Sequence, residues 1–224
     1  MTMKSTCRLQ WILPLLLFGA CSTTSEQEQI AGAAYSRYYI QDYVDVENLL
    51  VQTNSNYVGV VGHGRIISGS TLCSKYNDTG FNRTIALHST TAVANRFTAI
   101  DIVSDSDFDE RHKAGASLAD ITFFAGASAN NYIRSGYTQT FDWQNAPSFY
   151  KQDQLYTWYY NSRNNPVYIR LSEIGDADLA LLNPVFFLVF ESQPTASKSH
   201  RFVLTITDEK GKRIAAEFDW NASE

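Results

Sequence analysis

Residues 201–220, RFVLTITDEKGKRIAAEFDW, carry the clearest secondary-structure signal of the chain. The first half alternates apolar and polar side chains, so Phe202, Leu204 and Ile206 share one face of an extended strand. Asp-Glu-Lys-Gly-Lys at residues 208–212 then supplies a glycine-bearing turn. The second half offers cross-strand partners for the same face, namely Ile214, Ala216, Phe218 and Trp220. The stretch therefore predicts an antiparallel β-hairpin.

Short segments of similar character recur upstream of this hairpin and are separated by Asn, Ser, Gly or Pro clusters. They are residues 57–61, 99–103, 121–124, 155–160, 167–171 and 185–191. Gly62-His63-Gly64 favours a turn after the first of them. Between Tyr35 and Val51, apolar side chains stand at roughly helical spacing, which predicts one early helix; they are Tyr39, Tyr43, Val46, Leu49 and Leu50. The expected fold is mainly β, a single antiparallel β-sandwich-like domain with one short N-terminal helix.

The N-terminus has the pattern of an export signal. Lys4 and Arg8 precede an apolar run, residues 11–18, which is shorter than the roughly 20 residues that a membrane-spanning helix needs. Leu17-Phe18-Gly19-Ala20-Cys21 resembles the lipobox of bacterial lipoproteins, where the new N-terminal cysteine is lipidated. We expect a signal peptide at residues 1–20, a lipidated N-terminus and flexible tether at 21–34, and a β-rich domain at 35–224. An ordinary secretory signal with a chance cysteine is the alternative.

Lipidation at Cys21 would anchor the chain to a membrane, because two acyl chains already give stable binding. Ser22 follows the cysteine. In the enteric sorting rule, a residue other than Asp at this position is typical of lipoproteins sent to the outer membrane. We therefore expect an outer-membrane lipoprotein of the cell envelope, on its periplasmic or surface face.

Composition excludes some classes of function. Without residues 1–21 the chain keeps 16 basic and 23 acidic side chains, a net charge of −7, and no basic run. Nucleic-acid binding is disfavoured, because a phosphate-binding surface needs clustered Lys and Arg. Of the three cysteines, Cys7 leaves with the signal and Cys21 is modified, so Cys73 stands alone. An isolated cysteine is more often a small buried hydrophobe than a nucleophile.

Residues 125–154 are rich in aromatics and polar residues but have no sustained periodicity. Long connections of this kind are often functional. With the segment that follows, they offer aromatic side chains for a glycan or an envelope protein; the candidates are Tyr132, Tyr137, Trp143, Tyr156 and Trp158. The alternative is that these are aromatics of the core and of edge strands.

Asp105, Asp107 and Asp109 follow the alternate spacing of a calcium-binding loop, and oxygen ligands suit that hard cation. Glu110 and Ala116 stand where an EF-hand needs Gly and Glu, so this is no EF-hand. A structural calcium ion held by these three carboxylates is one hypothesis. A solvated acidic turn, with each Asp bonded to nearby backbone, is the other.

The same segment carries a family resemblance. Ser104-Asp105-Ser106-Asp107-Phe108-Asp109 and His112-Lys113-Ala114-Gly115-Ala116-Ser117-Leu118 follow a strand. This arrangement resembles uncharacterised lipoproteins of the Bacteroidota phylum that carry a domain of unknown function. The resemblance implies a β-sandwich domain in the envelope and carries over no catalytic residue.

Two hypotheses about function follow. The first is a non-enzymatic binding or structural module, which fits the absence of a nucleophile elbow, a P-loop, a dinucleotide fingerprint or zinc-ligand spacing in the sequence. The second is an envelope hydrolase of glycan or peptide that would use paired carboxylates drawn from Asp105, Asp107, Glu110 and Asp142. Such a pair must lie about 5 to 9.5 Å apart across a cleft.

Overall fold

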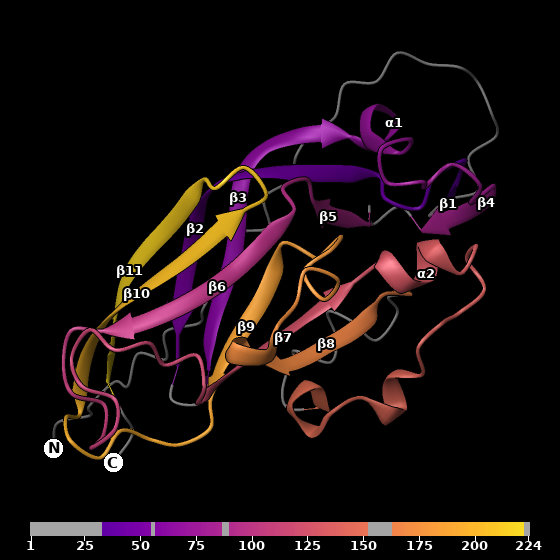
Figure 1. Cartoon of the computed structure of the whole chain (residues 1–224). Helices are drawn as coiled ribbons and strands as arrows, with labels where there is room; N and C mark the ends of the chain where they lie inside the picture. The colour runs from indigo at the N-terminus through magenta and orange to yellow at the C-terminus, as the bar shows by residue number, and fades with distance from the viewer. Residues whose placement is uncertain (1–32, 55–56, 87–89, 152–162, 222–224) are drawn as a thin grey trace, which may run out of the picture.

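The computed structural model describes residues 33–54, 57–86, 90–151 and 163–221, which form a mainly β protein with sheets packed as in a sandwich (Figure 1). The strands are β1 (Ala33–Ser36), β2 (Asp42–Thr53), β3 (Val58–Ser68), β4 (Arg83–Ala86), β5 (Thr91–Val93), β6 (Phe97–Ser104), β7 (Thr122–Ser128), β8 (Asn165–Arg170), β9 (Val185–Phe190), β10 (Ser199–Asp208) and β11 (Arg213–Asn221). Short helices are α1 (Gly69–Leu72), α2 (Asn130–Arg134), η1 (Trp143–Asn145), η2 (Ser148–Lys151) and η3 (Leu171–Glu173).

Two sheets enclose the main core. A six-stranded sheet has the order β5-β2-β3-β9-β7-β8, and a three-stranded sheet has the order β11-β10-β6; β1 and β4 form a separate pair. Strand β5 runs parallel to β2, and the other pairings are antiparallel. Apolar side chains from the facing sides of the two sheets form one cluster, including Val60, Phe124 and Leu188 from one sheet and Ile102 and Leu204 from the other.

The C-terminal hairpin is confirmed. Strands β10 and β11 pair with Phe202 opposite Phe218, Leu204 opposite Ala216, and Ile206 opposite Ile214. The side chains of Phe202, Leu204 and Ile206 are completely buried, as the alternation predicts. The predicted strands at 57–61, 99–103, 121–124, 167–171 and 185–191 fall within or largely on β3, β6, β7, β8 and β9, whereas residues 155–160 lie outside the described residues.

The predicted early helix is wrong, because residues 35–51 contain the end of β1 and most of β2. A β-bulge explains the misleading spacing. Pairing of β2 with β3 shifts between Val46 and Asn48, so one extra residue is inserted into the strand. Buried positions then follow at Val46 and Leu49, three residues apart as on a helix, although the chain is extended.

The turn predicted at Gly62-His63-Gly64 is also wrong, because β3 continues to Ser68. These glycines mark close contact with the bulge. A Cβ at Gly64 would lie 2.0 Å from the carbonyl oxygen of Asp45, and one at Gly62 would lie 2.9 Å from the side chain of Val46. A glycine inside a strand often signals such an approach of another backbone.

The six-stranded sheet is apolar on its outer face as well. There, Ala125, Ala127 and Phe187 contact Trp143, Ala146, Phe149 and Tyr150, which come from the segment containing η1 and η2. The hydroxyl of Tyr150 lies 2.6 Å from the carbonyl oxygen of Gly126 and 2.8 Å from that of Val167, tying the segment to β7 and β8. Within the described ranges, no helix has the length and hydropathy needed to cross a membrane.

Candidate functional site

The three aspartates of residues 105–109 each bind backbone N–H groups. Asp105 accepts from the amide of Arg201 at 3.0 Å, and Asp107 accepts from the amide of Ala114 at 2.9 Å. Asp109 accepts from the amides of Arg111 and His112 at 2.8 and 2.7 Å. These bonds lower the pKa of Asp105 and of Asp107. The carboxylates act as turn-stabilising acceptors, as the second hypothesis for this segment describes.

Among the residues that the structure describes, no three His, Cys, Asp or Glu side chains are grouped so as to hold a metal ion. The calcium hypothesis for Asp105, Asp107 and Asp109 stays a prediction.

His112 is clasped between two carboxylates. Its ring is 6% exposed, and Nδ1 lies 2.8 and 2.9 Å from the two oxygens of Asp109. On the other side, Nε2 lies 2.9 Å from Oδ1 of Asp120. A neutral imidazole has one N–H donor and one bare nitrogen, whereas the imidazolium donates from both. Only the charged ring satisfies both carboxylates.

The charges of this cluster, which we name the His112 clasp (Asp109, His112 and Asp120), shift its titration. Burial by itself disfavours the charged ring, but the hydrogen bonds that the ring donates to Asp109 and Asp120 outweigh it and raise the pKa of His112 above 6.5. Burial likewise opposes ionisation of Asp109, yet its bonds with His112 hold the pKa of that carboxyl below its ordinary value. Arg111 lies 4.0 Å from the other oxygen of Asp120 and adds a positive charge.

Ser104 and His200 resemble a catalytic dyad but are built as a structural contact. Ser104 Oγ lies 2.8 Å from Nδ1 of His200, and Nε2 of His200 lies 2.9 Å from the carbonyl oxygen of Ser197. The carbonyl can only accept, so Nε2 donates to it, and in the neutral ring Nδ1 then accepts from the serine hydroxyl. Both side chains are 2% exposed. Substrate therefore has no access to this serine in the observed fold.

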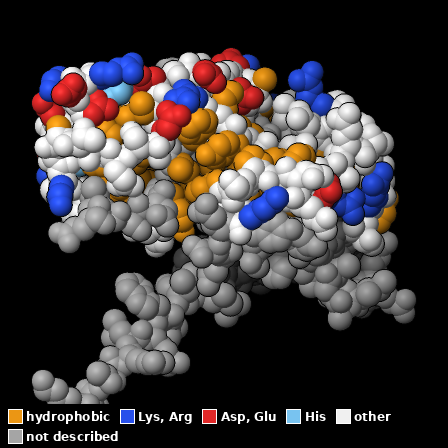
Figure 2. All heavy atoms as spheres, turned by 90° about the horizontal axis from the view of Figure 1, so that it is seen from below, with side chains coloured by type: hydrophobic (Ala, Val, Ile, Leu, Met, Phe, Trp, Pro, Cys, Tyr) orange, Lys and Arg blue, Asp and Glu red, His pale blue; other side chains and the backbone are white. Residues whose placement is uncertain are grey.

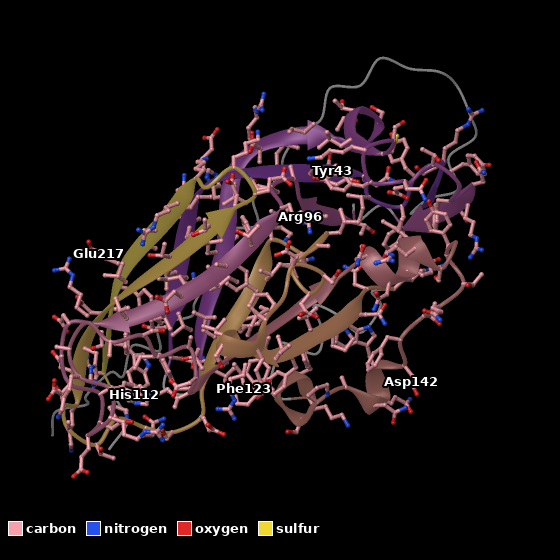
Figure 3. All side chains as sticks on the ribbon, in the orientation of Figure 1. Tyr43, Arg96, His112, Phe123, Asp142 and Glu217 are labelled. Carbon is pink, nitrogen blue, oxygen red and sulfur yellow. The ribbon has the colours of Figure 1, made fainter. Side chains whose placement is uncertain are left out.

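Asp142, one of the four carboxylates of the hydrolase hypothesis, lies apart from the acidic loop that holds the other three (Figure 3). Asp142 caps η1 by accepting from the amide of Gln144 at 3.0 Å and from the side chain of Asn145 at 3.0 Å. In Figure 3, Asp142 and His112, which belongs to the acidic loop, lie at opposite sides of the molecule's lower end. Asp142 therefore does not pair with a carboxylate of that loop, and the hydrolase hypothesis for the other three stays a prediction.

Three of the predicted binding aromatics are core residues. The exposed fractions of Tyr132, Tyr137 and Trp143 are 0%, 6% and 3%. Tyr132 and Tyr137 belong to a cluster with Tyr39 and Phe81, and Trp143 packs on the outer face of the six-stranded sheet. Their burial corrects the expectation that they face a partner. Tyr156 and Trp158 lie outside the described residues.

A different set of aromatics reaches the surface at β7 and β8. Phe123 and Tyr168 stack with ring centroids 5.1 Å apart and planes 9° apart, and the guanidinium of Arg170 lies 4.7 Å from the centroid of Phe123. Phe149 of η2 also stacks with Tyr168, with ring centroids 6.1 Å apart. We name these four residues the aromatic row. They meet because Arg170 is the cross-strand partner of Phe123, and Tyr168 points to the same face two residues earlier.

The aromatic row is accessible at Tyr168, which is 36% exposed, and Phe123 is half-buried. Figure 2 shows a band of hydrophobic side chains on the underside of the molecule, bordered by charged ones, and Figure 3 places Phe123 at that lower edge. Arg170 is held in a bidentate pair with Glu191 at 2.6 and 2.9 Å. Partial burial, together with the charge of Glu191, raises the pKa of Tyr168.

Asp78 is the centre of a buried polar cluster that the sequence analysis did not predict. It is completely buried and accepts from the amides of Tyr39 and Ile40 and, at 2.8 Å, from the hydroxyl of Tyr137. Burial and this bond raise the pKa of Tyr137. The only local signal is the turn-like Asn-Asp-Thr-Gly at 77–80, because the donors lie 38 to 59 residues away.

No protein-family model, no curated protein and no solved structure matches this chain. Cys21, the expected lipidation site, lies outside the described residues. Cys73 is a half-buried free thiol just after α1, with its sulfur 3.5 Å from the carbonyl oxygen of Ser70.

Proposed function

We propose that this protein is an outer-membrane lipoprotein, anchored through Cys21, whose β domain is a non-enzymatic module that binds a protein partner through the aromatic row. The observation that carries the proposal is the partly exposed stack of Arg170, Phe123 and Tyr168 beside the Arg170–Glu191 pair. Aromatic residues and arginine are enriched in the cores of protein interfaces and dominate their binding energy.

The stacking favours a protein over a glycan as the partner. The guanidinium of Arg170 lies over the ring of Phe123, and the ring of Tyr168 stacks with both Phe123 and Phe149. Because these ring faces already stack on one another, mainly the ring edges and the Tyr168 hydroxyl remain for contact with a partner. A flat sugar ring would need a free ring face, whereas a protein surface can contact edges, a hydroxyl and a salt bridge together.

Two exposed tyrosines allow a matched test. The lipidated protein and its Tyr168→Ser and Tyr35→Ser variants are recovered from native envelopes after mild cross-linking, and bound proteins are quantified by mass spectrometry. Tyr35 is 59% exposed and lies on β1, away from the row. We expect loss of a bound protein, by about tenfold or more, with Tyr168→Ser alone, since a central interface aromatic contributes about 2 kcal/mol.

Equal recovery with both variants would refute the aromatic row as the binding site. If the captured material is lost with Tyr168→Ser and is removed by glycosidases but not by protease, the partner is a glycan and not a protein. A Cys21→Ala variant, run in parallel, separates anchoring from binding, because it releases the chain from the membrane while leaving the β domain unchanged.

A further inference from the structure

The His112 clasp and the aromatic row are joined by a short chain of contacts. Asp120 binds the His112 ring with its side chain and accepts, through its backbone carbonyl, a hydrogen bond from the guanidinium of Arg170. Arg170 in turn pairs with Glu191 and lies over Phe123. One residue therefore touches both the titratable ring and the cation of the aromatic row.

Backbone bonds make this junction continuous. The amide of Glu191 donates to the carbonyl of Ile121 at 2.8 Å, and the amide of Ser172 donates to that of Ala119 at 3.0 Å. Residues 119–121 are thereby attached to both the end of β8 and the end of β9. A shift of Asp120 would therefore displace Arg170 and Glu191 as well.

We propose that the His112 clasp is a pH-sensitive latch that holds residues 105–120 against the sheets and keeps Arg170 in position. The consequence for partner binding, that the latch regulates the aromatic row, rests on the proposed function. The groups facing His112 are Asp109 and Asp120, with Arg111 beside Asp120, Arg170 at the end of β8 and Glu191 directly after β9.

The direction of the pH response follows from the charges. Because folding raises the pKa of His112, the latch contributes its full stability below about 6.5, the value for an unfolded chain, and loses it as pH rises through the folded-state pKa. Deprotonation of the ring would leave one nitrogen without a proton opposite a carboxylate, so one of the two hydrogen bonds would be lost. Because folding lowers the pKa of Asp109, a second loss occurs when pH falls below about 4 and that carboxyl takes up a proton.

The test uses the mature chain and needs no partner. Histidine ring resonances are followed by NMR from pH 5 to 10, and amide hydrogen exchange, corrected for its intrinsic pH dependence, is measured at residues 105–121 and 169–171. His63 is exposed on β3, so His63→Gln is the matched control for His112→Gln. Asp120→Asn tests the charge of the second carboxylate with little change in shape.

We expect His112 to titrate above 6.5 and Asp120→Asn to lower its pKa. Exchange at both segments should accelerate as His112 loses its proton, by about tenfold for each pKa unit of its upward shift. His112→Gln should remove this pH dependence, and His63→Gln should keep it.

Titration of His112 at or below 6.5 in the unmodified chain would overturn the latch without any variant, even if a variant failed to fold. Acceleration at 105–121 alone, with 169–171 unaffected, would overturn the link to Arg170. Neither result touches the dependence of partner capture on Tyr168, so the latch and the proposed function can fail separately.

Discussion

Two acidic clusters at different ends of the molecule stabilise their carboxylates with different hydrogen-bond donors. Asp78 is completely buried and is satisfied by backbone amides and a tyrosine hydroxyl, none of which carries charge. Asp109 and Asp120 are more exposed and share a histidine whose charge depends on pH. Figure 3 shows Tyr43, which lies near Asp78, at the top of the molecule and His112 at the bottom. A carboxylate held by neutral donors fixes structure, whereas one held by an imidazolium can respond to its surroundings.

The largest expected effect comes from removing the buried carboxylate. Asp78→Ala leaves the amides of Tyr39 and Ile40 and the hydroxyl of Tyr137 without their acceptor in the core. Each stranded group costs about 1–3 kcal/mol, so we expect a loss of about 3 kcal/mol or more in the free energy of unfolding. Urea unfolding followed by circular dichroism measures this loss. A loss below about 1 kcal/mol would mean that water replaces Asp78 and that the cluster does not fix structure.

A smaller effect is expected from the two tyrosines near Asp78. Tyr137→Phe removes a hydrogen bond to the carboxylate and should cost about 2 kcal/mol. Tyr43→Phe is the matched control, because the buried Tyr43 hydroxyl has no hydrogen-bond partner within the described part of the chain. We expect its removal to change the free energy of unfolding by less than about 0.5 kcal/mol or to stabilise the fold. Equal losses for both variants, measured by the same urea titration, would contradict this difference.

The smallest expected effect is that of calcium on the acidic loop. Asp105, Asp107 and Asp109 already accept hydrogen bonds from different backbone amides, so bringing the three carboxylates around one ion would compete with these bonds. A ligand that binds only the folded state raises the unfolding temperature. We expect no change in that temperature between millimolar calcium and a chelator. A rise of several degrees would establish the calcium site that the spacing of the aspartates predicts.

Local patterns in the sequence predict much of the fold. The alternation of residues 201–207 and the turn at 208–212 predict a hairpin that the structure confirms. The prediction of an early helix was wrong because the bulge after Val46 replaces a period of two with a spacing of three. The bulge packs closely against Gly64, which lies on another strand. A bulge is visible only once the two strands are paired.

The candidate site is harder to predict because its members are distant in sequence. Phe123 and Arg170 become neighbours only through the pairing of β7 with β8, and Glu191 lies beside them because β9, which it directly follows, pairs with β7. Aromatic content alone pointed to Tyr132, Tyr137 and Trp143, which the fold buries. The bond between His112 and Asp109 spans only three residues and follows from a local turn, but Asp120 completes the clasp from eight residues away.

Site-specific photo-cross-linking tests whether Tyr168 of the aromatic row contacts a protein partner. A photoreactive phenylalanine analogue is placed at position 168 or, as a control, at position 35 of the lipidated protein in its native envelope, and the irradiated products are separated by mass. We expect a discrete protein adduct from position 168 and none of that mass from position 35. Adducts of the same mass from both positions, or none from position 168 while position 35 reacts, would contradict this expectation.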